Sequence, residues 1–344
     1  MGDPGGIGAE IIVKALADPA LRRRAHVRIY GVEPCLRAAA DKARIEPFWW
    51  RVDGAAAPAI LETTLVHDVV VVDAGGTATD WPALSTRRGG AFSFRFVESA
   101  IADARRPRAD PLRADAIVTA PISKHSWALA GHDNYPGHTE LLGVRFNTPR
   151  VGMFFHAPAR GDWPAFNVIL ATVHLPLMDV RNVLTIGRVF DSIDLGNDAC
   201  RELGIDRPRI GVAGLNPHAG EAGLMGDEET RLIEPAIRAA VEAGIDARGP
   251  FPGDTIFNTL VSGGLDLVVA MYHDQGLIPV KLLARERAVN VTVGLPTVRT
   301  SPDHGTAFDI AGKNAADPGS MKSAITLAID MAERRASRPA GKAG

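Results

Sequence analysis

A series of short apolar runs, rich in β-branched residues, alternates along this 344-residue chain with segments of helical periodicity. Consecutive apolar positions indicate strands buried on both faces, and the intervening helices indicate a parallel sheet covered on both sides. The sequence therefore predicts an α/β fold. The runs are VRIYG (27–31), VVVVDAG (69–75), AIVTAP (116–121), FNVILATVHLP (166–176), RIGVAGLNP (209–217), LDLVVAMYH (265–273) and AVNVTVGLP (288–296).

Composition limits the function classes. Hydrophobic residues make up 46% of the chain, which is enough for a sizeable core. The 38 basic and 40 acidic residues are mixed along the sequence, so the basic footprint of a nucleic-acid binder is missing. Cys35 and Cys200 are too few for a disulfide framework. Since no signal peptide or membrane span is recognisable, we expect a cytoplasmic protein with no membrane or nucleic-acid partner.

Three histidines occur at the ends of predicted strands. His174 closes the run at 166–176, His218 follows the run at 209–217, and His273 closes the run at 265–273. The carboxyl ends of parallel strands open on one edge of a sheet, where ligands bind. Three imidazoles there would suit a catalytic divalent metal, although a single strand-end histidine is more often structural. The spacing does not name the metal.

Other polar residues at predicted strand ends suit an anion. Lys281, Asn290 and Arg299 flank the run at 288–296, and Lys124 follows the run at 116–121. A lysine charge and an arginine fork together bind phosphate or carboxylate, although each residue alone could equally be a solvated surface residue. The segment PGHTE at 136–140 adds His138 and Thr139, which could contact substrate oxygens.

The chain opens with GDPGGIG, followed by an amphipathic helical pattern. This is neither a dinucleotide fingerprint after a strand nor a Walker loop. We interpret it as a tight turn before a packed helix. Because such a turn ordinarily follows a strand, we expect either that a first strand is missing before Met1 or that the chain tolerates a shortened sheet edge.

Several motifs occur in one order along the chain. They are GDPGGIG, TAPISK, YPGHTE, ATVHLP, GLNPHAGE, YHDQGLIPVK, VNVTVGLPTVRTS and DHGTAFDIAGK. Together they make the chain resemble the 4-hydroxythreonine-4-phosphate dehydrogenase (PdxA) family over nearly its whole length. The segment HGTAFDIAGK also resembles the cofactor loop of isocitrate and isopropylmalate dehydrogenases, whose fold that family shares.

The resemblance implies a two-domain α/β/α architecture of the isocitrate/isopropylmalate dehydrogenase type. On this basis residues 1–122 with 303–344 would form one domain, and residues 123–302 the other, with a cleft between them. The second domain would carry most metal and substrate residues. The family is a homodimer whose metal sites lie at the subunit interface, so a monomer would be inactive.

The resemblance also implies site residues. The three metal ligands are His174, His218 and His273, the residues that the strand-end argument selects. The other implied residues fall into two groups. Substrate binding falls on His138, Thr139, Lys281, Asn290 and Arg299, and cofactor binding on His304, Gly305, Thr306 and Asp309. For proton transfer we select Asp254, Asp274 and Lys281, which lie beside a ligand or on a predicted strand-end loop.

The implied reaction is NAD-dependent oxidation of a secondary alcohol followed by decarboxylation, as in pyridoxine biosynthesis. NADP stays an alternative cofactor, and zinc is the expected metal with magnesium, manganese and cobalt as alternatives. The stretches LAGHDNYPGHTELLG and GDEETRLIEPAI look closer to the branch acting on 4-phospho-D-threonate or 4-phospho-D-erythronate. A third branch oxidises cis-dihydrodiol dicarboxylates, which would place a carboxylate where Lys281, Asn290 and Arg299 suggest phosphate.

Two alternative hypotheses assign the chain to other functional classes. Phosphate acyltransferases share a related architecture, and fold alone does not settle function. That reading needs no histidine triad. A non-catalytic metal- or ligand-binding protein would use the same glycine and histidine motifs for structure alone.

Overall fold

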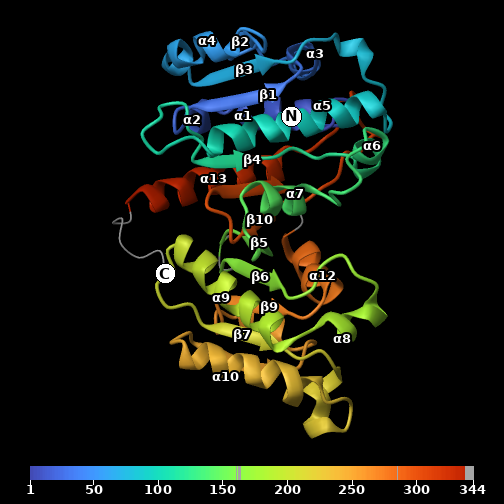
Figure 1. The fold of residues 1–344 in the computed structure, drawn as a ribbon, viewed down its shortest axis with the longest axis vertical. Helices are drawn as coiled ribbons and strands as arrows, with labels where there is room; N and C mark the ends of the chain where they lie inside the picture. The colour runs from blue at the N-terminus through green and yellow to red at the C-terminus, as the bar shows by residue number, and fades with distance from the viewer. Residues whose placement is uncertain (160, 162–163, 285, 338–344) are drawn as a thin grey trace. The chain divides into compact units, whose positions relative to one another are not determined.

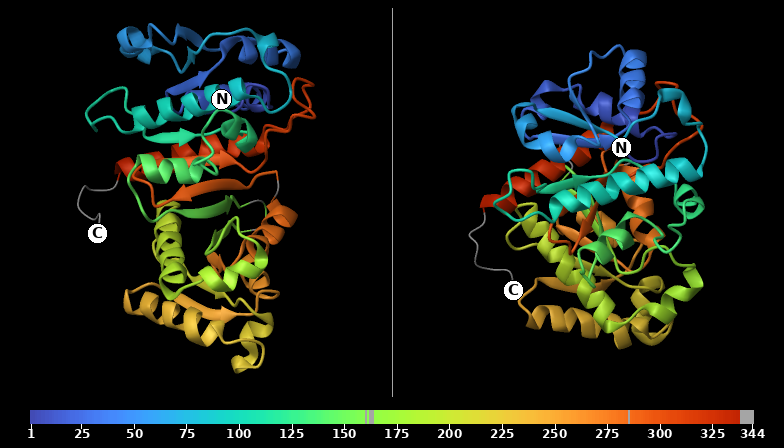
Figure 2. Two further views of the ribbon diagram at one scale, coloured as in Figure 1. Left: turned by 45° about the vertical axis from the view of Figure 1, so that its right-hand side comes forward. Right: turned by 45° about the horizontal axis from the view of Figure 1, so that its top comes forward.

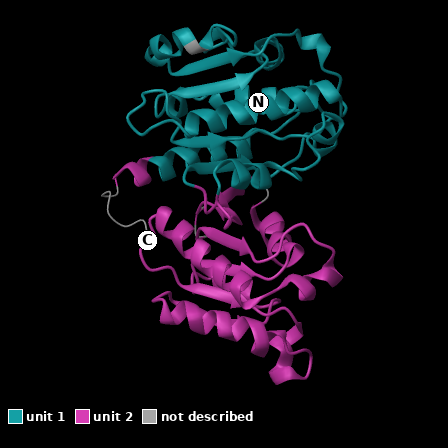
Figure 3. Ribbon diagram, viewed as in Figure 1, with its two compact units in different colours: residues 1–147, 296–332 teal, residues 148–295, 333–344 magenta. Residues whose placement is uncertain are grey.

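The computed structural model describes residues 1–159, 161, 164–284 and 286–337. The chain divides into two compact units, drawn in teal and magenta in Figure 3. Unit 1 consists of Met1–Asn147 and Pro296–Ala332, and unit 2 of Thr148–Leu295 and Glu333–Gly344. The fold is mixed α/β, as predicted.

The chain passes from one unit to the other after Asn147 and after Leu295. The sequence suggested domain boundaries at 122/123 and 302/303 instead. Residues 123–147 stay with unit 1 because they pack on its long helix α5 (Arg87–Ala104). A Cβ atom on Gly90 of α5 would lie 1.9 Å from the Ser126 carbonyl oxygen, and the Trp127 indole donates to Ser93 at 3.0 Å. Only glycine allows this close approach.

Unit 1 contains a three-stranded parallel sheet in the order β1-β3-β2. Its strands are β1 (Val27–Gly31), β2 (Trp50–Asp53) and β3 (Val69–Asp73). Every residue of the central strand β3 is buried, as the unbroken valine run predicts. The short strand β2 was not recognised in the sequence, because its burial pattern leaves a single residue, Val52, inside.

A second parallel pair in unit 1 joins β4 (Ala116–Val118) to β11 (Val298–Pro302), which brings distant parts of the chain together. Behind β11 the hydroxyl of Thr300 donates to the Ala324 carbonyl of α13 at 2.8 Å. The remaining elements of this part are α1 (Gly8–Leu16), α2 (Pro19–Arg22), α3 (Glu33–Ala43), α4 (Ala57–Ile60), η1 (Leu61–Val66), η2 (Ala78–Asp80), α6 (Lys124–Leu129), α7 (His138–Arg145) and α13 (Gly319–Ser337).

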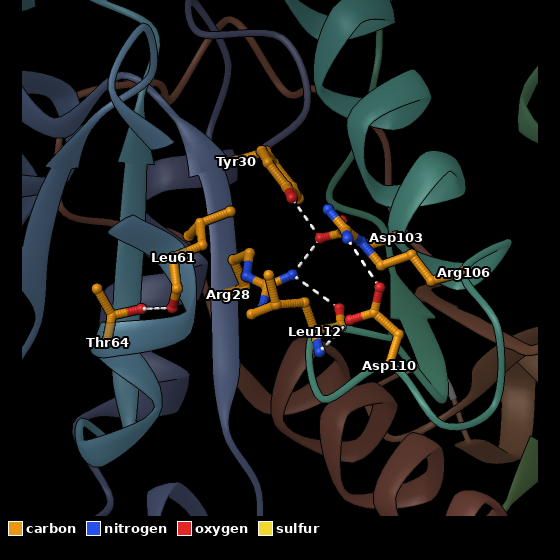
Figure 4. Close-up of polar contacts among 8 residues, drawn as sticks. All are labelled: Arg28, Tyr30, Leu61, Thr64, Asp103, Arg106, Asp110 and Leu112. Atoms are coloured by element: carbon orange, nitrogen blue, oxygen red, sulfur yellow. Dashed lines mark hydrogen bonds and ion pairs between the residues drawn. The ribbon is translucent and has the colours of Figure 1, made fainter. Parts of the chain in front are cut away.

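A buried carboxylate fastens α5 to the first sheet. Asp103, near the end of α5, accepts hydrogen bonds from Arg28 and Tyr30 of β1, and from Arg106 Nε at 2.9 Å (Figure 4). The Asp103 side chain is only 5% exposed. Burial, and then the hydrogen bond to Asp103, raise the pKa of the Tyr30 phenol. The network therefore locks helix to strand with every carboxylate oxygen satisfied.

Unit 2 contains six strands in the order β10-β5-β6-β9-β7-β8. They are β5 (Gly152–Ala157), β6 (Phe166–Leu170), β7 (Ile210–Ala213), β8 (Ala247–Phe251), β9 (Leu267–Ala270) and β10 (Val289–Val293). The prediction of a parallel sheet holds for β6, β9, β7 and β8. It is wrong for the predicted strand β10, which pairs antiparallel with β5. The strand β5 also pairs antiparallel with β6, and it was not recognised in the sequence.

Helices cover both faces of this sheet. Alternate residues of a strand point to opposite faces. Val168 and Leu170 of β6 contact Gly276 of α12 (His273–Ala284), whereas Ile169 contacts Gly196 of α9 (Ile186–Glu202). The two helices accordingly flank the central strands in both Figure 1 and Figure 2. The other elements of unit 2 are η3 (Leu177–Asp179), α8 (Val180–Val183), η4 (Pro217–Gly223), η5 (Glu229–Ile233), α10 (Glu234–Glu242) and α11 (Ile256–Val261).

Across the described part of the chain, we find no helix with the length and apolarity needed to cross a membrane.

Replacing Asp103 tests the lock between α5 and β1. Asp103→Ala leaves the Arg28 guanidinium and the Tyr30 phenol without their acceptor, so we expect a loss of about 3 kcal/mol in the free energy of unfolding. Urea denaturation measures this loss. Asp115→Ala is the control, because Asp115 is 74% exposed and its ion pair with Arg113 spans 3.9 Å. Equal midpoints for the two variants would contradict the assignment.

Candidate active site

The strands that precede the three histidines are neighbours in unit 2. β6 pairs with β9, and β9 with β7, all parallel, so their carboxyl ends lie at one edge. The strands end earlier than predicted, at Leu170, Ala213 and Ala270, and short loops carry the chain on to His174 and His218. His273 is the first residue of α12.

Two of the three imidazoles are close together. The ring centroids of His174 and His273 lie 5.6 Å apart. His273 Nδ1 lies 2.7 Å from an Asp274 carboxylate oxygen, and His218 Nδ1 lies 2.9 Å from one of Glu221. A carboxylate on Nδ1 orients an imidazole and leaves Nε2 as the atom that binds a cation. The chemistry of these side chains is therefore that of metal ligands.

The structure does not bring His218 into one group with the other two. Among the residues that it describes, no three His, Cys, Asp or Glu side chains are arranged to hold a metal ion. The pair His174 and His273 is therefore an observation, whereas the three-histidine site stays a prediction.

His218 lines an open depression of about 590 Å³, which also contains a candidate proton-transfer residue, Asp254. The remaining lining residues are Glu221, Ala222, Pro252 and Thr255. The sequence suggested a strand-end loop for Asp254, but it did not indicate that this loop meets His218, because the two residues follow different strands, β8 and β7.

The other candidates of unit 2 lie on α12 and β10. Asp274 and Lys281 are two helical turns apart on α12, which places them on one face. Asn290 lies on β10, and its buried Oδ1 has no hydrogen-bond partner among the described residues. A buried acceptor without a partner costs free energy, so Asn290 is suited to receive a donor from a ligand.

In unit 1, His138 and Arg299 interact in a buried setting. His138 begins α7, packs edge-on against Trp127 at 5.5 Å, and has a buried Nε2 with no partner in the described structure. Burial, and then the charges of Arg299 and Lys124, hold the pKa of His138 well below its usual value. His138 is therefore neutral near pH 7, with a ring nitrogen available to a ligand.

Arg299 lies on β11 and is 3% exposed. Its guanidinium donates to the Thr119 hydroxyl at 2.7 Å, and burial lowers its pKa to about 10. The nearby carboxylate of Glu140 acts in the opposite direction and raises the pKa of Arg299. An anion beside Arg299 would offset the cost of burying this cation. Thr139, next to His138, lies in the first turn of α7.

The predicted cofactor residues His304, Gly305, Thr306 and Asp309 lie in unit 1, between β11 and α13. The Thr306 carbonyl accepts a hydrogen bond from the Ile7 amide at 3.0 Å. This loop therefore packs on the glycine-rich turn at the other end of the sequence. The structure holds the loop in place, and its role in cofactor binding stays a prediction.

Close packing explains the glycine-rich turn itself. Gly2 has a φ of +77°, and a Cβ atom there would lie 2.2 Å from the Pro121 carbonyl oxygen. A Cβ atom on Gly8 would lie 2.1 Å from the Met1 carbonyl oxygen. These contacts agree with the interpretation of GDPGGIG as a tight turn before helix α1.

Sequence reasoning missed two residues that hold the histidine segments. Glu229 accepts hydrogen bonds from the loop before His218, and Gln275 joins Met271 to Gly214. Both lie inside motifs that were quoted, but only the folded chain shows their partners.

Comparison with known proteins extends this description. The family model of the pyridoxal phosphate biosynthetic protein PdxA matches residues 23–328. The chain is 42% identical to a D-threonate 4-phosphate dehydrogenase of Cupriavidus necator, over 98% of this chain and 97% of that protein. It is 41% identical to a 4-hydroxythreonine-4-phosphate dehydrogenase of Beijerinckia indica, over 95% and 92% respectively.

Among solved structures, it is similar to a 4-hydroxythreonine-4-phosphate dehydrogenase of Klebsiella pneumoniae, with a TM-score of 0.79 and 39% identity. That match covers 96% of this chain and 98% of the other. The family model and these identities lead to one conclusion: the chain belongs to the PdxA family.

Proposed function

We propose that this protein is an NAD-linked dehydrogenase that oxidises a small phosphorylated hydroxy acid, which then loses carbon dioxide. The observation that carries the proposal is the buried pair of neutral His138 and cationic Arg299, which offers a ligand both a free ring nitrogen and an anion partner. The relatives named as dehydrogenases of phosphorylated substrates support it. The proposal includes the isocitrate/isopropylmalate dehydrogenase type of two-domain fold.

The substrate would be bound mainly through its charged ends. Arg299 and Lys281 supply positive charge for phosphate, and His138, Thr139 and Asn290 supply polar contacts to oxygens. Two relatives of nearly equal sequence identity are named for different substrates, D-threonate 4-phosphate and 4-hydroxythreonine 4-phosphate. These substrates carry a hydroxyl and an amine, respectively, at carbon 2, and the substrate panel below distinguishes them. A cis-dihydrodiol dicarboxylate is the weaker alternative, because Lys281, Asn290 and Arg299 favour phosphate.

His174, His218 and His273 would hold a divalent cation, with zinc the first candidate and magnesium, manganese and cobalt the alternatives. When bound, such a cation stabilises negative charge on the reacting oxygen. The carboxylates of Asp274 and Glu221 orient their imidazoles for this role. An acyltransferase would not require these three histidines.

NAD, or NADP, would supply the acceptor for the hydride that leaves the alcohol carbon. The residues proposed to bind it are His304, Gly305, Thr306 and Asp309. For the hydroxyl proton, Asp254 is the best-placed of the candidates, because it shares the depression with His218. Asp274 is already engaged with His273, and Lys281 would serve the protonation that follows carbon dioxide loss.

Exposed apolar side chains support the proposal of a homodimer. An exposed large hydrophobic residue follows each of the three candidate metal ligands within ten residues of the sequence. Met178 is 80% exposed, Leu224 is 81% exposed, and Leu282 is 80% exposed. Exposed apolar side chains next to a candidate site are typical of surfaces that a partner covers. We propose a second copy of this chain as that partner.

The activity is tested with NAD and a panel of substrates. The panel contains 4-phosphohydroxythreonine, 4-phospho-D-threonate, 4-phospho-D-erythronate and a cis-dihydrodiol dicarboxylate. We expect NADH formation and carbon dioxide release with one of the phosphorylated acids, and loss of both on chelation with EDTA. The proposal would be refuted if no NADH formed with any of these substrates in the presence of zinc, magnesium, manganese or cobalt.

Metal binding is tested separately by His218→Ala. We expect the zinc content after dialysis to fall from one equivalent per chain to near zero, while the circular dichroism spectrum is retained, because His218 is an exposed loop residue. His26→Ala serves as the control, since His26 lies in unit 1. Unchanged zinc stoichiometry in His218→Ala would remove it from the ligand set.

The dimer is tested with Ile278→Lys/Leu282→Lys. These residues are 64% and 80% exposed and lie one turn apart on α12. If a second copy covers them, burying lysines there weakens association by roughly 3 kcal/mol or more, which sedimentation equilibrium measures. Val66→Lys, at an 82% exposed position of unit 1, is the matched control. An unaltered dissociation constant would place the interface elsewhere.

A further inference from the structure

The loop that carries His218 has an unusual backbone. All five residues from 218 to 222 have a positive φ, between 47° and 79°, and only one of them is glycine. Each non-glycine residue in this conformation costs of the order of 1 kcal/mol or more. Such a run persists only where the surrounding structure holds it in place.

A buried carboxylate lies beneath this loop. Glu229 is 3% exposed and begins the π-helical turn η5. Its Oε1 accepts hydrogen bonds from the backbone amides of Leu215 at 2.8 Å and Asn216 at 2.7 Å. Its Oε2 accepts from the Asn216 side chain at 2.9 Å. Hydrogen bonds to a charged acceptor are stronger than neutral ones, so the carboxylate anchors the chain just before His218.

The loop encloses this carboxylate on two sides. A Cβ atom on Gly220 would lie 2.7 Å from Glu229 Oε2, and one on Gly214 would lie 3.0 Å from Oε1. The glycines at 214 and 220 therefore make room for the Glu229 side chain. The loop and the carboxylate fit each other as one packed unit.

The neighbouring Glu228 has a different role. Its Oε2 accepts from the Asn216 side chain at 2.8 Å, and its other oxygen lies 3.5 Å from Arg181. In the described part of the chain, no backbone amide of the His218 loop donates to Glu228, whereas two amides just before His218 donate to Glu229. Glu229 is therefore the residue that fixes the loop backbone.

The base of the same loop is tied to the segment of His273. Gln275 donates to the Gly214 carbonyl at 2.7 Å and accepts from the Met271 amide at 2.7 Å. Gly214 directly precedes Leu215, which Glu229 holds. Gln275 and Glu229 thus hold adjacent residues of the His218 loop, and Gln275 also joins this loop to the end of β9 before His273.

We propose that Glu229 is a positioning residue that holds the His218 loop in its left-handed conformation and so directs His218 toward a bound divalent cation. The inference rests on the proposed role of His218 as a metal ligand. Glu229 itself would contact neither the cation nor the substrate.

The test uses cobalt(II) titration of the full-length protein, followed by its visible absorption spectrum. We expect Glu229→Ala to weaken cobalt binding by about 10- to 100-fold, as is typical for loss of a group that supports a ligand, and to change the spectrum. Glu229→Gln keeps an oxygen for the two backbone amides and should restore most of the affinity. Glu242→Gln, an exposed site at the end of α10, is the control.

A second readout needs no metal. In the metal-free protein, Glu229→Ala should increase amide hydrogen exchange at Leu215 and Asn216, with the α9 and β9 amides unchanged. If Glu229→Ala does not fold, Glu229→Gln is measured in its place. Loss of the negative charge weakens the hydrogen bonds from both amides, so we expect faster exchange at Leu215 and Asn216 and a small loss of cobalt affinity; wild-type exchange and affinity would overturn the positioning role.

The outcomes separate this inference from the proposed function. Wild-type cobalt affinity and spectrum in folded Glu229→Ala, together with loss of cobalt binding in His218→Ala, would overturn the positioning role and leave the metal site standing. Wild-type cobalt binding in His218→Ala would overturn the metal ligand itself, and the positioning role with it.

Discussion

The parallel pairing of β6, β9 and β7 is the constraint on which the candidate metal site depends. Parallel strands carry their carboxyl ends to one edge, so the segments with His174, His273 and His218 all begin there. The buried faces of these strands set the pairing, because Val168 and Leu170 pack toward α12 while Ile169 packs toward α9. A shift of one residue would exchange these faces and bury the wrong side chains. Packing in the core thus determines where the histidine segments start.

Buried polar groups in this protein fall into two kinds. The carboxylates of Asp103 and Glu229 have all their partners within the chain, and they lock one element to another. His138 Nε2 and Asn290 Oδ1 are buried without partners in the described structure. An unpartnered buried group costs about 1–3 kcal/mol, and folding alone gives no reason to keep it. The second kind is what a ligand-binding protein requires, whereas the first supplies the rigidity around it.

The exposed surface of unit 2 has a related asymmetry. Apolar side chains such as Leu177, Leu224 and Leu282 are exposed beside the segments that carry the histidines. The polar residues of these segments would meet the substrate and a cation, and the apolar ones would meet a second subunit. A site that shares its surroundings with an interface would couple assembly to activity.

The α/β class, most strand positions and the strand-end placement of the histidines could be predicted from the amino-acid sequence alone, because apolar runs and their spacing indicate which segments are buried. Sequence reasoning missed β2, β5, β8 and β11, whose short, mixed or polar patterns carry little of that signal. Only the tertiary structure placed Asp254 beside His218, Arg299 beside His138, and Glu229 beneath the His218 loop. Those pairs join residues on different elements, and which of them meet is decided by how the elements pack.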